Sequence, residues 1–485
     1  MKRIGILLLA LTLAPAFARA DLDSDIKAVL RDKALARAEV GMAVVRLGAD
    51  AKADHVLVRH NSEIPLIPAS NLKLVTTAAA LDLFGHDFKF RTLLLKHNND
   101  LVLVGDGDPT LGDADLLRKS GWGPNTLFQQ WADQLKKRGL TNFDRVVFDD
   151  SVFDQAFYHP GWPAEQFHKH YCAQVGGLNF NANLLSFYLR STSPGQPIGY
   201  ILEPATKYAS IRNTCVTGGE QVIGLARHDA TNQVVLSGHG RGSDVGYQVT
   251  IHDPGMFAAT NLAETMVASG VALKSAAPAR DRTLRAQLLK GGVDEKAGWA
   301  VLGVLETPLS AALARANKDS INLYAESLCK RMGAESGEPG SWRTGTAAMG
   351  KFLEKVGVPA TEYTFADGSG LSRANTVSAS ALCKVLSHAY HSSDREAYLT
   401  SLSVAGKDGT LETRFAGTLS DMRGRVFGKS GFINQVRTLS GYLKAKDGQW
   451  YAFSILMNNM ADTATGKNLQ EAILRAVDQH SASTK

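Results

Sequence analysis

Helical and strand-like hydrophobic patterns alternate along this sequence of 485 residues. Apolar residues recur at helical spacing over 22–37 and then mark two strands, at 40–47 and 55–60. A helix is expected to follow over 68–81, entered from an extended segment that carries a proline and ended by Gly85. The N-terminal pattern therefore predicts a helix, two strands and a second helix.

Three strand-like runs lie near the C-terminus, at 426–432, 436–444 and 450–457. Asp447-Gly448 supplies a tight hairpin turn between the last two runs, and a final helix is expected over 467–478. Together with the two N-terminal strands, these runs predict one five-stranded antiparallel sheet with helices on its faces.

The middle third of the chain has a different pattern. Its first part predicts a small α/β unit made of a hairpin, a helix and a strand, at 90–95 with 101–104, at 126–138 and at 145–148. Short apolar strands separated by turn residues then fill 185–252, which predicts a small all-β module. A helix over 258–269 closes the region, and from Leu302 onward the pattern returns to long helices.

The chain is too long for one ordinary hydrophobic core, which suggests two or three domains. We expect the middle third to be an insertion into a domain whose sheet is completed by both ends of the chain. The expected limits are 21–95 with 273–485 for the first domain, 96–186 with 246–272 for the inserted second domain, and 187–245 for a β-rich third domain. The predicted fold class is therefore a multidomain α/β protein.

The first twenty residues have the features of a secretory signal peptide. Met1-Lys2-Arg3 is a basic start, residues 4–13 form an apolar segment too short to span a bilayer, and Ala18-Arg19-Ala20 is a cleavage motif. Cleavage is expected after Ala20; an uncleaved N-terminal anchor is the alternative. Because no later segment has the long apolar run of a transmembrane helix, we expect an exported, periplasmic protein.

Charge and cysteine content argue against a nucleic-acid-binding protein and against a disulfide-stabilised one. Removing the signal peptide lowers the formal net charge from +6 to +3, without the charge runs of a nucleic-acid-binding arm. Four cysteines are few for this length, so disulfides are not expected to be the main source of stability. Cys172 and Cys215 flank a strand-rich region and are candidates for a bridge in an oxidising compartment. Cys329 and Cys383 fall on apolar helix faces and are expected to be buried thiols.

The helix at 68–81 carries the first candidate for chemistry. Ser70 is expected at its N-terminus and Lys73 one turn further on, so that the lysine amine can reach the serine hydroxyl. An adjacent unprotonated amine is one way to activate a serine as a nucleophile, and the helix N-terminus favours the developing anion. A lone Ser-x-x-Lys pattern arises easily by chance, so its weight depends on the rest of the chain.

Two later stretches complete a constellation. Ser320-Ile321-Asn322 lies in a turn that opens a helix, where a hydroxyl and an amide can point into one cleft as proton carrier and substrate ligand. Lys429-Ser430-Gly431 lies on a C-terminal strand, where a cation, a hydroxyl and a glycine suit an extended substrate that ends in a carboxylate.

In this order and context, Ser-x-x-Lys, Ser-x-Asn and Lys-(Ser/Thr)-Gly form the motif set of penicillin-recognising serine enzymes. Three further stretches resemble the D-Ala-D-Ala carboxypeptidase/endopeptidase family, the penicillin-binding protein 4-like, low-molecular-mass class C group: Gly105 to Leu111, Asp367 to Arg373 and Ala405 to Arg414. The resemblance covers essentially the whole mature chain. One departure is Ser430, where the family usually has threonine; the hydroxyl is kept, so carboxylate binding is expected to survive.

The resemblance implies a β-lactamase/transpeptidase-like domain interrupted by a second domain, which is itself interrupted by a third. It also implies hydrolysis of the terminal D-Ala, or of D-Ala cross-links, in peptidoglycan stem peptides through an acyl-enzyme. β-Lactams would then be covalent inhibitors, and no cofactor, metal or nucleic acid is implied. The oligomeric state and the balance between the two activities stay open.

The resemblance also assigns roles to single residues. Ser70 would be the nucleophile and Lys73 its base, with a pKa lowered by nearby Lys429. The remaining roles are proton transfer by Ser320, substrate-amide binding by Asn322, carboxylate binding by Lys429 and Ser430, close approach of substrate at Gly431, and an oxyanion hole formed by the backbone N–H groups of Ser70 and Phe432. Each such oxyanion donor is commonly worth about 3 kcal/mol. Asp149, Arg373 and Asn434 are further candidates for substrate contact; the alternative for Asp149 is a turn residue at a strand end.

Other interpretations were weighed against this one. A serine β-lactamase shares the three motifs, but no glutamate is placed like the deacylating base of the class A enzymes, and the insertion is unlike theirs. A non-catalytic penicilloyl-binding sensor would lack a catalytic residue, and none is missing. A calcium loop at Asp106, Asp108, Asp113 and Asp115 lacks the required glycine and glutamate, and a zinc site at His168, His170 and Cys172 lacks a fourth ligand.

Overall fold

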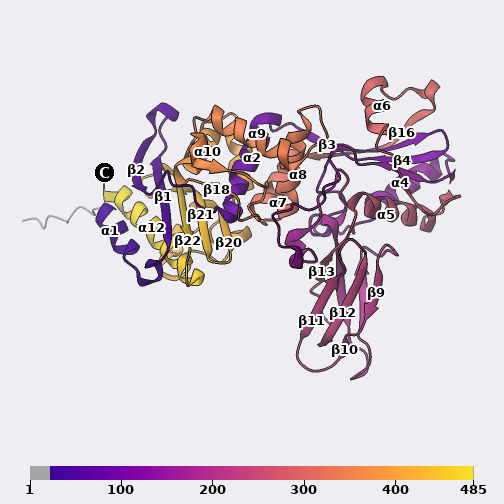
Figure 1. The fold of residues 1–485 in the computed structure, drawn as a ribbon, viewed down its shortest axis with the longest axis horizontal. Coiled ribbons are helices and arrows are strands. Elements are labelled where there is room, and N and C mark those ends of the chain that lie inside the picture. Colours follow the sequence, from indigo (N-terminus) through magenta and orange to yellow (C-terminus); the bar gives the residue numbers. More distant parts are fainter. Residues whose placement is uncertain (1–21, 484–485) are drawn as a thin grey trace, which may run out of the picture.

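The computed structural model describes residues 22–483, so the predicted signal peptide lies outside the described residues. In Figure 1 a helix-flanked sheet lies at the left and a second sheet at the right, and a β-rich module extends downward below the second sheet. Across residues 22–483, no helix has the length and apolar character needed to cross a bilayer.

The first sheet has six strands in the order β19-β20-β21-β22-β1-β2, and every neighbouring pair is antiparallel. Its strands are β1 (Glu39–Arg46), β2 (His55–His60), β19 (Ser403–Val404), β20 (Val426–Ile433), β21 (Val436–Lys444) and β22 (Trp450–Asn458). The five predicted strands are all present, but the predicted count is wrong. The sixth strand, β19, has only two residues, too few to show a period in the sequence.

Alternate residues of the central strands pack into two cores. Met42 and Val44 of β1 join the core beneath α1 (Leu22–Leu30) and α12 (Thr463–Ser483), whereas Ala43 and Val45 join the core on the opposite face. Six helices lie in or against that second core: α2 (Leu72–Phe84), α7 (Leu309–Asn317), α8 (Asn322–Ala334), α9 (Trp342–Lys355), α10 (Ala379–His391) and α11 (Arg395–Ser401).

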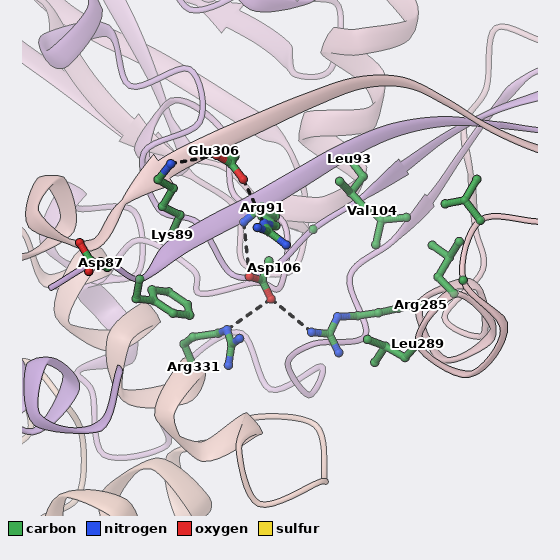
Figure 2. A pocket seen from close by; sticks show the side chains of 15 residues that line it. Asp87, Lys89, Arg91, Leu93, Val104, Asp106, Arg285, Leu289, Glu306 and Arg331 are labelled. Atoms are coloured by element: carbon green, nitrogen blue, oxygen red, sulfur yellow. Dashed lines mark hydrogen bonds and ion pairs between the residues drawn. The ribbon is translucent and has the colours of Figure 1, made fainter. Parts of the chain in front are cut away.

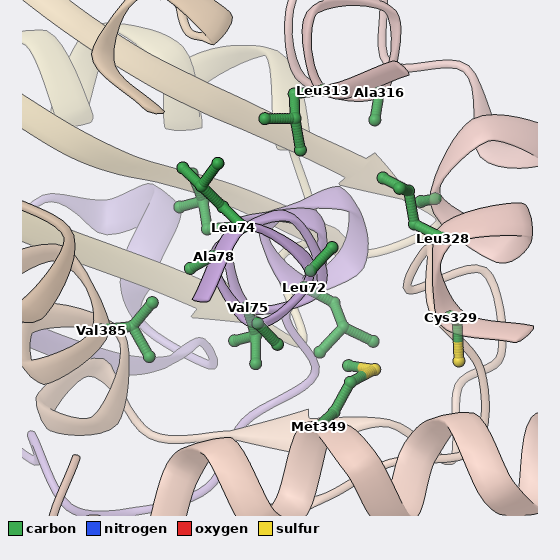
Figure 3. Close-up of a cluster of buried hydrophobic side chains, with 14 of the residues drawn as sticks. Leu72, Leu74, Val75, Ala78, Leu313, Ala316, Leu328, Cys329, Met349 and Val385 are labelled. Atoms are coloured by element: carbon green, nitrogen blue, oxygen red, sulfur yellow. The ribbon is translucent and has the colours of Figure 1, made fainter. Parts of the chain in front are cut away.

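Helix α2 is the centre of this larger core. Its residues from Leu72 to Leu81 are all buried, and side chains of α7, α8, α9 and α10 surround it, among them Leu313, Leu328, Met349 and Val385 (Figure 3). A helical segment that is buried on every side is stable only where neighbouring elements cover it. The segment that carries Ser70 and Lys73 is thereby fixed in the middle of the domain.

The second sheet has five strands in the order β15-β6-β4-β3-β16. Its strands are β3 (Lys89–His97), β4 (Asp100–Val104), β6 (Val146–Asp149), β15 (Ala279–Arg280) and β16 (Trp299–Pro308). Helices α4 (Thr126–Lys137) and α5 (Pro254–Ala268) cover one face, and α6 (Leu284–Gly291) packs on the other. The short helix α3 (Ala114–Arg118) and the strand pairs β5 (Asn142–Phe143) with β14 (Ala272–Leu273) and β17 (Tyr363–Thr364) with β18 (Thr376–Val377) complete the structure outside the β-rich module.

The expectation of helix from Leu302 onward is wrong for its first residues, because Trp299–Pro308 is the strand β16. The register between β16 and β3 shifts between Val301 and Gly303. Such a bulge breaks the two-residue alternation by which a strand is recognised in a sequence. Helix begins only at Leu309.

The short strands expected over 185–252 form two small sheets. One contains β7 (Leu184–Arg190), β8 (Gly199–Glu203) and β13 (Tyr247–Thr250); the other contains β9 (Ser210–Asn213), β10 (Val216–Thr217), β11 (Val222–Arg227) and β12 (Gln233–Gly240). Phe187 and Leu236 of this module share a core with Phe128 and Phe257 of α4 and α5. The five-stranded sheet contains β3, β4 and β6 from before this module in the sequence and β15 and β16 from after it. The division into domains stays a prediction.

All four cysteines are buried free thiols. The candidate bridge between Cys172 and Cys215 is wrong, because the two residues belong to different cores: Cys172 packs near α8, and Cys215 lies in the core of the β-rich module. Cys329 and Cys383 are buried on α8 and α10, as the sequence predicted.

Candidate active site

Ser70 lies in a single 3₁₀ turn, Ala69–Asn71, immediately before α2. Ala69 has φ of 45°, a left-handed conformation that is unfavourable for a residue with a Cβ. Neighbouring strands hold this turn in place. Thr438 of β21 donates a hydrogen bond of 2.8 Å to the Pro68 carbonyl, and the Asn71 amide lies 2.8 Å from the Lys429 carbonyl of β20.

The Lys73 amine lies 3.0 Å from the Ser70 hydroxyl oxygen. It also donates hydrogen bonds to Asn322 Oδ1 (2.7 Å) and to the Ser369 carbonyl (3.0 Å). Burial lowers the pKa of Lys73 to about 8, while the negative charges of Glu326 and Asp367 oppose that shift. The predicted direction is correct, but its predicted cause is not: burial outweighs any effect of Lys429, and it is the pKa of Lys429 that burial and the charge of Lys73 lower together.

A buried loop, residues 367–370, forms the floor beneath Lys73. Glu326 of α8 accepts hydrogen bonds from the backbone N–H groups of Gly368 (2.9 Å) and Ser369 (2.8 Å). Asp367 accepts from the N–H of Gly370 and from the Trp162 indole at 2.9 Å. Burial, followed by the charge of Asp367, raises the pKa of Glu326 to about 7. The loop therefore supplies a carbonyl to Lys73 and holds two carboxylates close behind it.

The second motif lies at the start of α8, as predicted. Ser320 occupies the turn before the helix with φ of 61°, and α8 begins at Asn322. While Asn322 Oδ1 accepts from Lys73, its Nδ2 donates to the Tyr171 carbonyl at 2.8 Å. The amide thus joins Lys73 to the loop that carries Tyr171.

The third motif lies on β20, next to the turn that carries Ser70. Lys429 is buried and donates to the Ser430 carbonyl at 2.8 Å, and the Ser430 hydroxyl donates to Thr410 Oγ1 at 2.9 Å. A Cβ at Gly431 would lie 2.1 Å from Thr438 Oγ1 and 3.0 Å from the backbone nitrogen of Ser70. The glycine therefore lets the Ser70 turn approach the strand closely; the predicted approach of substrate at Gly431 stays a prediction.

A pocket of about 750 Å³ lies at Ser70. Of the predicted site residues, its lining includes Ser70, Ser320, Asn322, Phe432, Arg373 and Asn434, but not Lys73, Lys429, Ser430 or Gly431. Arg373 donates to the Asn434 carbonyl at 2.9 Å, and Phe432 is 56% exposed with the Arg437 guanidinium over its ring. Trp162, Gln166 and Tyr171 line the same pocket.

The family model of D-Ala-D-Ala carboxypeptidase 3 (S13) matches residues 22–480, nearly the whole described chain. The chain belongs to the S13 family. It is a serine-type D-Ala-D-Ala carboxypeptidase, as the three motifs predicted. It is 30% identical over 473 residues to a D-alanyl-D-alanine carboxypeptidase of Actinomadura sp. (strain R39), covering 92% of this chain and 82% of that protein. It is 23% identical to the D-alanyl-D-alanine carboxypeptidase DacB of Haemophilus influenzae, covering 84% of this chain and 83% of that protein.

Solved structures share the fold of this S13 enzyme. The crystal structure of penicillin binding protein 4 from Haemophilus influenzae superposes with a TM-score of 0.73 at 20% identity, covering 94% of this chain and 99% of that one. The peptidoglycan endopeptidase Bd3459 from Bdellovibrio bacteriovorus gives a TM-score of 0.52 at 15% identity, with coverage of 92% and 94%. The fold is therefore that of penicillin binding protein 4, a mixed α/β structure with several sheets.

Asp149 does not reach the pocket of this S13 enzyme. Its carboxylate is fully buried and accepts hydrogen bonds from the backbone N–H groups of Ser151 (2.6 Å) and Arg285 (2.7 Å). These contacts cap the end of β6 and the start of α6. The prediction of a substrate contact for Asp149 is therefore wrong, and the alternative of a turn residue at a strand end is the correct one.

The four acidic residues at 106–115 are engaged by arginine, tyrosine and hydroxyl groups. Asp106 pairs with Arg285 and Arg331, and Asp113 contacts Arg315 and Tyr324. Asp108 accepts hydrogen bonds from the hydroxyl groups of Thr110 and Thr307.

Sequence reasoning missed several residues around the S13 site. Tyr171 contributes a backbone carbonyl, which no side-chain pattern reveals. Glu326 lies one turn after Asn322 and reads as an ordinary polar helix residue. Asp367 and Thr410 lie in two of the stretches that resemble the family. The sequence therefore marked their positions, although it suggested no role for either residue.

Proposed function

We propose that Ser70 is the nucleophile of this carboxypeptidase and that Lys73 is its general base. The observation that carries this proposal is the set of three contacts at the Lys73 amine. A neutral amine has two N–H bonds and one lone pair. The N–H bonds satisfy Asn322 and Ser369, which leaves the lone pair for the proton of the Ser70 hydroxyl 3.0 Å away. Burial favours this neutral form.

In the proposed reaction, the Ser70 oxygen attacks the carbonyl carbon of the penultimate D-Ala while its proton passes to Lys73. The backbone N–H groups of Ser70 and Phe432 stabilise the oxyanion. The C–N bond then breaks, and the leaving D-Ala amine takes a proton by way of Ser320. Water releases the acyl group from Ser70 in a second cycle of the same kind.

Lys429 and Ser430 hold the C-terminal carboxylate of the substrate in this proposal. They lie on β20 beside the Ser70 turn, where an extended peptide can run along the strand. Arg373 and Asn434, which line the pocket, contact the remainder of the stem peptide. The substrate class is peptidoglycan stem peptides, cut at the terminal D-Ala or at D-Ala cross-links, and β-lactams acylate the same serine.

The proposed compartment is the periplasm, reached by means of the N-terminal signal peptide. The proposed architecture is a β-lactamase/transpeptidase-like domain around the six-stranded sheet, interrupted by the unit of the five-stranded sheet, which carries the β-rich module. The inserted unit supports catalysis directly, because Tyr171 and Trp162 reach the pocket and the buried loop.

The test compares Ser70→Ala with Ser237→Ala, a matched change on β12 of the β-rich module. Ser70→Ala is expected to abolish covalent labelling by a fluorescent penicillin and release of D-Ala from a stem pentapeptide, whereas Ser237→Ala keeps both. Labelling that persists in Ser70→Ala would refute the assignment. Rapid nitrocefin turnover by the parent enzyme would favour a β-lactamase instead.

A further inference from the structure

A second large pocket, of about 740 Å³, lies at the outer face of the five-stranded sheet (Figure 2). Strands β3, β4 and β16, helix α6 and the end of α8 supply its walls. Arg331 of α8 lines it nine residues beyond Asn322, about 13 Å along the helix axis. The pocket is nearly as large as the one at Ser70 but shares none of its lining residues.

One half of this second pocket is aliphatic. Leu93 and Val104 form its floor on the sheet, and Leu288, Leu289 and Val293 form a wall on and after α6. Helix α6 packs on this face of the sheet through Leu284 and Leu288, and Leu289 is left 72% exposed. Grouped exposed aliphatic side chains next to a concave surface are a feature of ligand sites.

The other half is charged and is centred on Asp106 (Figure 2). Arg285 and Arg331 approach the same oxygen of Asp106, at 3.2 and 3.3 Å. Lys89 and Arg91 likewise share Glu306, at 3.0 and 3.1 Å. Each of these two carboxylates therefore forms ion pairs with two cations.

The side chains that line the pocket carry an excess of one positive charge. Four cations face three carboxylates: Lys89, Arg91, Arg285 and Arg331 against Asp87, Asp106 and Glu306. Arg331 also pairs with Glu335, which lies outside the lining, and stacks on Phe84 and Phe88, so it is a fixed part of the wall. The excess of one positive charge matches a single negative charge, and guanidinium groups match a carboxylate in shape.

We propose that this pocket binds a small aliphatic monocarboxylate. Its carboxylate lies against Arg285 and Arg91, and its aliphatic part covers Leu93, Val104 and Leu289. The aliphatic chain covers Leu289, which is otherwise exposed, and burial of apolar surface favours binding by about 25 cal/mol per Å². Two sources have this chemistry, a fatty acid and the C-terminus of a peptide with an aliphatic side chain.

Calorimetric titration of the whole protein with octanoate tests the proposal, with N-acetyl-leucyl-alanine as the peptide source and octanamide as the neutral control. Octanoate or the peptide is expected to bind saturably at one site, and octanamide at least tenfold more weakly. The dipeptide lacks a D-Ala-D-Ala end, and binding is expected to be unchanged in Ser70→Ala, which separates this site from the catalytic one.

Two variants locate the site. Arg285→Ala is expected to weaken binding roughly ten- to a hundredfold, because it removes a charged hydrogen-bond donor. Leu289→Asp places a negative charge in the aliphatic half and is expected to abolish binding. The matched controls, Arg343→Ala and Val222→Asp, change an exposed arginine and an exposed valine elsewhere and should leave the affinity unchanged. The proposal fails if neither acid binds saturably, or if Arg285→Ala and Leu289→Asp bind as well as the parent.

Discussion

The Asp113 carboxylate lies 2.9 Å from the Arg315 guanidinium, and both side chains are buried. Asp113 lies at the start of α3, and Arg315 lies on α7. Arg315 also pairs with Asp319, and its carbonyl accepts a hydrogen bond from Ile321 N at 3.2 Å. Because Asp319 and Ile321 flank Ser320, this ion pair holds the turn in which Ser320 adopts its left-handed conformation.

Asp113→Asn is therefore expected to lower both stability and the rate of acylation by penicillin. Removing one partner of a buried ion pair commonly costs about 3–5 kcal/mol, because the other charge is left unpaired. Thermal unfolding gives the first effect, and stopped-flow acylation well below the unfolding temperature gives the second. Asp115→Asn is the matched control: Asp115 also contacts Arg315, but it is 52% exposed, and exposed pairs contribute about 1 kcal/mol or less. Acylation at the parental rate in Asp113→Asn would show that the ion pair does not position Ser320.

The acylation rate is expected to rise with pH and to level off above about 8, the pKa of Lys73. Only the unprotonated amine accepts the proton of Ser70, and its fraction grows as the pH rises through that value. The same shift makes the contribution of Lys73 to stability increase with pH between about 8 and the model-compound value of 10.5, since the unfolded chain binds more protons in that range. Rates of penicillin acylation from pH 6 to 10 measure the midpoint.

Glu326→Gln tests the origin of that midpoint. The Glu326 carboxylate raises the pKa of Lys73, so its neutralisation is expected to move the midpoint of the acylation profile to lower pH. The maximal rate will also fall if the loop at 367–370 loosens, but loosening alone does not require the midpoint to move downward. A midpoint unchanged from the parent would mean that Glu326 acts only as a structural support for the loop.

Gly431→Ala is expected to slow acylation strongly while leaving the protein folded. The added methyl group would meet Thr438 Oγ1 and the backbone nitrogen of Ser70, and so displace one of the two oxyanion donors. Losing one such donor commonly costs about a hundred- to a thousandfold in rate. Gly123→Ala is the control, because no atom lies within 4 Å of its added Cβ and the glycine has no positive φ. Normal acylation of Gly431→Ala would contradict the proposed position of the oxyanion hole.

Ser430→Ala is expected to reduce kcat/KM for a stem peptide by roughly ten- to a hundredfold, since a hydrogen bond to a carboxylate is worth about 1.5–3 kcal/mol. Ser430→Thr keeps the hydroxyl and should be nearly neutral. A substrate with an amidated C-terminus already lacks most of this contact, so the same substitution should harm it much less. Equal losses for the acid and the amide would show that Ser430 does not bind the carboxylate.

The six-stranded sheet could largely be predicted because its central strands are buried on both faces and appear in the sequence as nearly continuous apolar runs. The strand 436–444 was predicted to the residue, and β1 to within one residue at each end. The two-residue strand β19 and the bulged strand β16 were missed because neither presents an unbroken period. The boundaries of the insertion depend on strand pairing between distant segments, which a local pattern does not contain.

The catalytic motifs could be recognised because their spacing reflects local geometry, with Lys73 one helical turn from Ser70. The residues around the motifs, which set their contacts and pKa values, could not be predicted. Tyr171 acts through its backbone carbonyl, and Glu326 acts through a loop more than forty residues away in sequence. Asp149 has the chemistry of a site residue, but its carboxylate caps the start of α6 instead. Burial, which decides the pKa of Lys73, is likewise a property of the assembled helices and not of the motif.

The four buried thiols can be used to measure local unfolding of the enzyme. Thiol reagents attack the thiolate, and burial raises the pKa of every cysteine, to about 12 for Cys172. Modification therefore has to wait until the surrounding core opens. Cys215 reports on the core of the β-rich module and Cys329 on the core around α2, so timed alkylation with peptide mass mapping reads the two openings separately in a single sample. Since no disulfide has to form, the same experiment runs on enzyme produced and stored under reducing conditions.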